Sequence, residues 1–202
     1  MSNNQGSYLM LESTYLIRKN RAICQKLITE GNFSENNIID ILISLHLVLE
    51  IGINGLFHVI SLKSFEKDID MLDIMENVDK IGFIEKINMF IYFGSFNFDK
   101  KLDKATKYHK ILNTLKDFTY VRNALLHGHS IMTIYEFQKG SKEKSTRMKD
   151  KLNKIFLQEH IKQFKFIMDG IGFYLECYET DKISVDIKSG WYGTYLNTGF
   201  LK

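Results

Sequence analysis

Apolar residues recur at helical spacing along most of the chain, and polar or glycine-containing interruptions indicate where the helices end. The apolar stripe of Tyr8 to Glu30 predicts one helix, which closes at Gly31. Ser34 and the acidic Glu35 have the chemistry of a helix start, and they predict a second helix that continues to about Leu62.

Three more segments keep the helical spacing before residue 128. They predict a short helix at about Ser64 to Val78, another at Ile81 to Phe93, and a long one at Lys104 to Leu126. Gly94 to Asp99 is expected to form a loop. The 202 residues include no proline, so the residue that interrupts helices most sharply is missing from the sequence.

The pattern changes after Gly128. Ser130 to Gln138 is rich in β-branched and aromatic residues and predicts a strand, which Ile183 to Ile187 could meet in a small hairpin. Lys139 to Asp150 is highly charged and predicts a loop. Leu152 to Tyr178 returns to helical spacing, although two internal glycines weaken that prediction.

These segments predict a single, mainly α domain over residues 1–202, organised as a helical bundle with a possible β-hairpin after the fifth helix. Residues 1–33 would form an N-terminal helix, residues 34–130 the core, and residues 131–202 a strand, a basic loop, a C-terminal helix and an aromatic tail. The tail is expected to pack as a flap or a dimer strap. Hydrophobic residues make up 45% of the chain, which excludes wholesale disorder.

Charge is nearly balanced overall but unevenly distributed. The formal net charge is +3, whereas Lys139 to Lys154 alone carries seven basic and two acidic residues, a local +5. This stretch fits either a solvated face or a surface that follows a nucleic-acid backbone. In the second interpretation, the contacts to the nucleic-acid backbone come from Lys142, Lys144, Arg147 and Lys149.

Cysteine content and hydropathy bear on the compartment. Cys24 and Cys177 provide neither a disulfide framework nor zinc-ligand spacing, which favours a reducing interior, and the first residues lack a signal-peptide pattern. Ile38 to Leu62 is long enough to span a bilayer, but it contains Asp40 and Glu50, and a charge at bilayer depth costs about 2.5–3.5 kcal/mol. We therefore expect a buried helix and a cytoplasmic protein without a membrane partner.

The segment Phe118 to His129 (FTYVRNALLHGH) carries the candidate chemistry. Arg122 precedes His127 by five residues, and Asn123 precedes His127 by four. On a helix, Asn123 and His127 lie about 40° apart, whereas Arg122 lies about 140° from His127. A site that uses Arg122 and His127 together therefore needs a shared cleft, most simply one formed by two copies across a two-fold axis.

A structural role for the same residues is the alternative. Arg122 would then form a buried pair with a carboxylate, and His127 would cap the C-terminal end of its helix, where cations are favoured. Lysine outnumbers arginine 23 to 4, so the prevailing basic residue of the chain does not account for Arg122. Arginine is the side chain suited to a planar grip on phosphate.

The sequence RNALLHG, Arg122 to Gly128, resembles the Arg-x4–6-His motif of HEPN domains, helical bundles found in toxin–antitoxin pairs, phage-exclusion systems and CRISPR effectors. Leu47 to Phe57 and Asp79 to Phe90 are similar to two helices of such domains, so the resemblance covers roughly residues 34–130. It implies a HEPN-like bundle, in which Arg122, Asn123 and His127 are the catalytic residues.

Many members of this family are metal-independent endoribonucleases, so the resemblance implies cleavage of single-stranded RNA without a metal or cofactor. The ribose 2′-hydroxyl would attack the adjacent phosphate and leave a cyclic phosphate and a free 5′-hydroxyl. A histidine can exchange protons near neutral pH, and an arginine can stabilise the charge that develops on the phosphate. The resemblance also implies a homodimer, a toxin or phage-defence setting, and a possible antitoxin partner.

Other interpretations stay open at this point. Some toxin members continue the motif as His-x-Tyr, whereas here His129 takes the place of that Tyr and also satisfies the longer Arg-x6-His spacing. Glu50 is a candidate partner of Arg122, and His46 and His58 are expected to be satisfied core or boundary histidines. The alternative functions are a HEPN-fold dimer that binds RNA or a nucleotide without cleavage, and a regulatory helical protein in which Arg122 is structural.

Overall fold

The computed structural model describes residues 3–64, 77, 80–96, 103–127, 151–178 and 195–202. These residues form five helices and a terminal 3-10 turn: α1 (Asn3–Glu30), α2 (Glu35–Ser64), α4 (Phe83–Phe96), α5 (Asp103–His127), α8 (Lys154–Tyr178) and η1 (Gly199–Leu201). The described part of the chain contains no strand, which confirms the mainly α class. The predicted hairpin and most of the short helix at Ser64 to Val78 lie outside the described residues.

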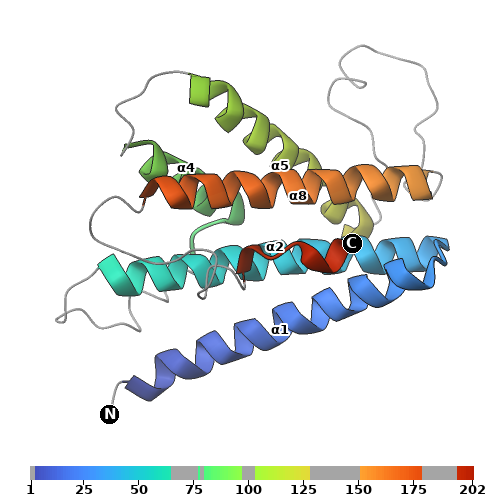
Figure 1. Ribbon diagram of the computed structural model, residues 1–202, viewed down its shortest axis with the longest axis horizontal. Helices are drawn as coiled ribbons and strands as arrows, with labels where there is room; N and C mark the ends of the chain where they lie inside the picture. The colour runs from blue at the N-terminus through green and yellow to red at the C-terminus, as the bar shows by residue number, and fades with distance from the viewer. Residues whose placement is uncertain (1–2, 65–76, 78–79, 97–102, 128–150, 179–194) are drawn as a thin grey trace.

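Helix α2 is the centre of the bundle. It packs against each of the other four helices. Figure 1 shows α1, α2 and α8 running alongside one another, with α5 oblique to α8. The side chains that α2 buries completely follow helical spacing, and they are Ile38, Ile41, Leu45, Val48, Leu49, Ile53 and Leu56.

The same helix is apolar and long enough to cross a membrane, by length and composition alone. The candidate stretch is Glu35–Phe57, with a mean hydropathy of 1.7. Within the bundle, 61% of that stretch's most apolar window is buried. The core helices of folded domains share these properties, so the expected burial of α2 is confirmed, while the location of the protein in the cell stays a prediction.

Local sequence signals account for the ends of the first two helices. Gly31 adopts a φ of 67°, the left-handed conformation that glycine tolerates best, and its N–H donates to the Ile28 carbonyl oxygen at 3.2 Å. Ser34 Oγ accepts a hydrogen bond from the Asn37 N–H at 3.4 Å. Both predicted boundaries are therefore confirmed.

Other helix ends differ from the prediction. Helix α1 begins at Asn3, five residues before Tyr8, and α4 begins at Phe83, two residues after Ile81. The expected loop at Gly94 to Asp99 is wrong for its first three residues, because α4 continues to Phe96. One glycine costs a helix only about 1 kcal/mol relative to alanine, which is not enough to end it. Helix α8 begins at Lys154, two residues later than expected, because Asn153 Oδ1 caps it by accepting from the Phe156 N–H at 3.0 Å.

Neither glycine of α8 interrupts the helix, and Gly170 marks close packing against α5. The helix runs without interruption through Gly170 and Gly172. A Cβ atom added at Gly170 would lie 2.5 Å from Ile111 Cδ1 of α5. The absence of a side chain at this position therefore lets α5 approach α8.

The end of the aromatic tail packs into the bundle, as expected for a flap. Tyr195 is completely buried, and its ring lies against α2, where a Cβ atom added at Gly55 would be 2.5 Å from Tyr195 Cζ. Arg21 of α1 donates from Nη2 to the Tyr195 carbonyl oxygen at 3.1 Å, and its guanidinium lies 5.4 Å from the centre of the Phe200 ring. Burial lowers the pKa of Arg21 to about 10, so Arg21 stays charged at neutral pH. The earlier part of the tail, including Trp191, lies outside the described residues.

Candidate functional site

Three helices bring a set of polar residues together on the side of α2 that faces α4 and α5. Helix α2 contributes three of them at four-residue intervals, a spacing that places them along one face. Helix α4 contributes one and the C-terminal half of α5 contributes two. This polar cluster consists of His46, Glu50, Asn54, Lys86, Arg122 and Asn123.

Arg122 lies at the edge of the polar cluster and is partly open to solvent. Its Nη1 donates to Asn123 Oδ1 at 2.9 Å, and its Nη2 lies 3.8 Å from Glu50 Oε2. The side chains of Arg122 and Glu50 are 32% and 34% exposed. The structure thus brings these three predicted residues together. A guanidinium has five N–H donors, so the contacts with described residues leave donors available to a ligand.

Glu50 is held in its ionised form by its neighbours. His46 Nδ1 lies 3.6 Å from Glu50 Oε2, and the approach of this ring is the largest cause of the lowered pKa of Glu50. The positive charges of Arg122 and Lys86 lower that pKa further. Half-burial of the carboxylate acts in the opposite direction but is outweighed.

His46 lies inside the bundle, as expected, but its hydrogen bonding does not match the expectation. Its side chain is 3% exposed, and its ring stacks on Phe118 at 5.6 Å between centroids and tilts against Phe83 at 5.6 Å. Within the described residues, neither ring nitrogen has a partner at hydrogen-bond distance. The two aromatic rings that enclose the imidazole offer no oxygen to it, so the Glu50 carboxylate, slightly too distant for a hydrogen bond, is its polar neighbour.

Lys86 belongs to the polar cluster and was missed by the sequence reasoning. It is 2% exposed, and its Nζ donates to Asn54 Oδ1 at 2.7 Å. Lysine is almost never fully buried unless it has a partner. The signal in the sequence was its position three residues after Phe83 and four before Phe90, which places a lysine on the apolar face of a predicted helix.

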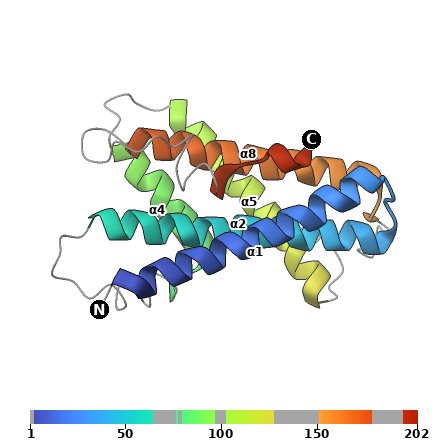
Figure 2. The ribbon, with the colours of Figure 1, turned by 60° about the horizontal axis from the view of Figure 1, so that its bottom comes forward.

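His127 stands apart from the polar cluster on the same helix. It is exposed and is the last residue of α5. Figure 2 shows this end of α5 projecting past α2. Five residues of helix turn its side chain about 140° from that of Arg122. His129 and the basic residues Lys142, Lys144, Arg147 and Lys149 lie outside the described residues, so their predicted roles stay predictions.

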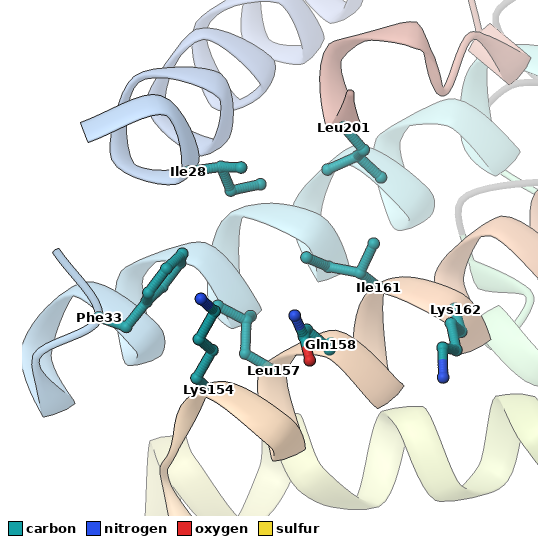
Figure 3. Close-up of a pocket in the computed structure, with 8 residues that line it drawn as sticks. All are labelled: Ile28, Phe33, Lys154, Leu157, Gln158, Ile161, Lys162 and Leu201. Carbon is teal, nitrogen blue, oxygen red and sulfur yellow. The ribbon is translucent and has the colours of Figure 1, made fainter. Parts of the chain in front are cut away.

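A cavity of about 410 Å³ lies elsewhere, between the end of α1, the start of α8 and η1 (Figure 3). Its lining combines five apolar residues with three polar ones: Ile28, Phe33, Leu157, Ile161, Leu201, Lys154, Gln158 and Lys162. Lys154 Nζ lies 5.2 Å from the centre of the Phe33 ring, and Lys162 pairs with Glu159 at 2.6 Å. The described lining of this cavity includes no residue of the polar cluster and no acid–base pair for catalysis.

The part of the chain that the structure describes contains no set of metal ligands. No group of three or more His, Cys, Asp or Glu side chains there could hold a metal ion. The polar cluster instead offers two cationic groups, a carboxylate, an imidazole and two amides, a donor-rich set that suits an anion.

The chain matches no protein-family model, no curated protein and no solved structure. The likeness to HEPN domains therefore rests on the residues of the Arg/His motif and the helices around it.

Proposed function

We propose that the protein is a metal-independent endoribonuclease of HEPN type, which cleaves single-stranded RNA with Arg122, Asn123 and His127. The observation that carries this proposal is the state of Arg122. Its guanidinium is one-third exposed and, among the described residues, is held by one amide and one ion pair of 3.8 Å, so these contacts orient it without saturating it. A structural arginine would instead be buried, as Arg21 is at 8% exposure.

Charge within the polar cluster supports the same proposal. Lys86 and Arg122 both act as cations on the single carboxylate, Glu50. The cluster thus carries an excess of positive charge in a half-buried position, where electrostatic attraction is stronger than in bulk water. A phosphate of the RNA backbone would balance that excess.

The proposed reaction needs a proton acceptor, a proton donor and stabilisation of charge on the phosphate. The 2′-hydroxyl oxygen attacks the adjacent phosphorus and loses its proton to a neutral histidine, while the bond from phosphorus to the 5′-oxygen breaks and that oxygen receives a proton from a second, protonated histidine. The products are a 2′,3′-cyclic phosphate and a free 5′-hydroxyl. Arg122 donates to the phosphate oxygens as their charge increases, and Asn123 holds Arg122 in the required orientation.

Two copies of the chain would complete the active site. Because Arg122 and His127 leave α5 in directions about 140° apart, one helix does not direct both side chains to one phosphate. A two-fold axis beside the projecting end of α5 would place the His127 side chains near the Arg122 side chains of both copies. We therefore propose a homodimer with a composite cleft, and a toxin or phage-defence effector as its setting.

The test is cleavage of a labelled single-stranded RNA by purified protein in EDTA. Arg122→Ala and His127→Ala should each lower the rate by at least about 100-fold, the usual contribution of acid–base or charge-stabilising groups. Matched controls are His109→Ala, an exposed histidine on the same helix, and Arg18→Ala, an exposed arginine on α1. Both controls should cleave like the wild type.

The ends of the products and the response of the variants decide the outcome. Cyclic-phosphate ends that disappear in both motif variants support the proposal. Equal cleavage by Arg122→Ala and the wild type would point to a contaminating nuclease and refute it. Binding of RNA without any cleavage would favour the alternative, a non-catalytic RNA-binding dimer. Comparison with His129→Ala identifies which histidine acts.

A further inference from the structure

The buried lysine of the polar cluster is not one of the three residues to which the proposed reaction assigns a step. Lys86 lies on α4, outside the motif helix, and donates to Asn54 Oδ1 at 2.7 Å while only 2% exposed. Removing an ammonium group from water costs free energy that an apolar residue at this position would not cost. The position of Lys86 therefore calls for a role that requires its charge.

The partner of Lys86 places it next to Glu50. Asn54 lies one helical turn after Glu50 on α2, so the amide that holds the ammonium group and the carboxylate occupy the same face of that helix. The charge of Lys86 favours the ionised form of Glu50. Lys86 and Glu50 are thus coupled electrostatically as well as positioned together.

Glu50 is shared by groups from three helices. His46 of α2 approaches it to 3.6 Å, Arg122 of α5 to 3.8 Å, and Lys86 of α4 acts on it through its charge. His46 and Lys86 are buried, whereas Arg122 is one-third exposed. Of the three, Arg122 is therefore the group that can turn toward solvent and a ligand.

We propose that Lys86 is a positioning residue. It holds the Glu50 carboxylate in place and balances its negative charge when Arg122 leaves Glu50 to pair with a phosphate of the RNA. Before binding, Glu50 orients Arg122. After binding, Arg122 pairs with the phosphate while Glu50 retains Lys86 and His46. Without Lys86, the departure of Arg122 would leave the half-buried Glu50 carboxylate next to the phosphate without a lysine or arginine to balance its charge. The repulsion between the two anions would oppose phosphate binding. This inference rests on the proposed function, since RNA supplies the phosphate.

The perturbation that tests it removes the charge of Lys86 while preserving its size. Lys86→Met gives an apolar side chain of similar length, and Lys86→Gln keeps a group that can hydrogen bond to Asn54 if the methionine variant unfolds. Lys162→Met makes the same chemical change on the surface of α8, where the lysine is 71% exposed, and serves as the matched control. Thermal unfolding shows that each variant is folded.

Two measurements follow the coupling directly. Carboxyl 13C NMR gives the pKa of Glu50, which should rise in both Lys86 variants and stay unchanged in Lys162→Met. Titration with inorganic phosphate, followed at the Arg122 Nε–H signal, should show binding about tenfold weaker in Lys86→Met, or about 1.4 kcal/mol. In a Glu50→Gln background, Lys86→Met should weaken phosphate binding less than about twofold, because no carboxylate remains to be compensated.

The outcomes separate this inference from the proposed function. An unchanged pKa of Glu50 in both Lys86 variants overturns the positioning role. If Lys86→Met weakens phosphate binding equally in the Glu50→Gln background, Lys86 acts without Glu50 and the positioning role is overturned. A wild-type protein that binds no phosphate overturns it as well. If the pKa and phosphate results are as expected but the wild type cleaves no RNA, the ribonuclease proposal fails and the role of Lys86 stands.

Discussion

Replacing Gly55 by alanine tests the packing of the tail against α2. Alanine is favoured over glycine inside a helix by about 1 kcal/mol, so propensity alone predicts a more stable protein. The structure predicts the opposite. The added Cβ would lie 2.5 Å from Tyr195 Cζ, 2.6 Å from Cε1 and 2.8 Å from Oη, and Tyr195 is completely buried.

The magnitude follows from comparing two responses of the tyrosine ring. Shifting the ring within the core costs about 1–3 kcal/mol, the usual cost of overpacking. Expelling it would lose about 150–250 Å² of buried surface at about 25 cal/mol/Å², or about 4–6 kcal/mol at most. The shift is the cheaper response. Since three ring atoms overlap the new methyl group, we expect the shift of the ring to cost about 3 kcal/mol. The gain in helix propensity offsets about 1 kcal/mol of this, so the net loss of stability is about 2 kcal/mol.

Urea unfolding followed by far-UV circular dichroism measures this loss. Gly172→Ala is the matched control, because its Cβ would meet Leu196 Cδ1 at an ordinary 3.5 Å, and it should stabilise the protein by about 0.5–1 kcal/mol. In a Tyr195→Ala background the ring is gone, so Gly55→Ala should become stabilising too. A Gly55→Ala protein as stable as the wild type, or an equal loss in both backgrounds, would refute the packing described for Tyr195.

Three further predictions concern titration. The pKa of Glu50 is lowered by His46 and the nearby cations. The contribution of Glu50 to stability is therefore present above its ordinary pKa of 4.5 and is lost as the pH falls through its pKa in the folded protein. Glu50→Gln should remove that part of the acid sensitivity, measured by urea unfolding between pH 3 and 7. Burial lowers the pKa of His160 below 6.5, so the free energy of unfolding should fall as the pH drops below about 6.5. His160→Phe should make this pH dependence less steep. An unchanged pH dependence in the variant would contradict the prediction. Burial raises the pKa of Cys24 to about 12, which leaves only about one thiolate in ten thousand at pH 8; peptide mass spectrometry should find Cys24 alkylated by iodoacetamide in urea, and rapid alkylation of the folded protein would contradict its burial.

Features set by neighbouring residues were predictable from the sequence. The ends of α1 and α2 depend on Gly31 and Ser34, whose roles as C-terminal glycine and N-cap are decided within one turn of helix. The mainly α class follows from apolar spacing in the same way. The end of α4 was misplaced because a glycine inside a helix and a glycine in a loop look alike when packing is unknown.

The polar cluster was predictable only in part. Arg122 and Asn123 were found through their motif, and Glu50 was named as a partner of Arg122. The burial of Lys86 and its bond to Asn54 depend on how α4 packs against α2, a contact between residues 32 apart that no local pattern determines. Likewise, Gly170 weakened the prediction of a helix from the sequence, whereas its close approach to Ile111 of α5 is evident only in the packed bundle.

The bond between Arg21 and Tyr195 has a consequence for the order of folding. It joins residues 174 apart, whereas α1 and α2 are connected by a few residues and can pair at once. Because the entropy lost on closing a loop increases with its length, the α1–α2 hairpin should form early and the contact of Tyr195 late. The Tyr195 ring packs on Gly55 of α2 and the Tyr195 carbonyl oxygen accepts from Arg21 of α1, so the two contacts can form together only after that hairpin has formed. Docking of this segment therefore reports that the rest of the bundle has already assembled, and its release should be the first step of unfolding.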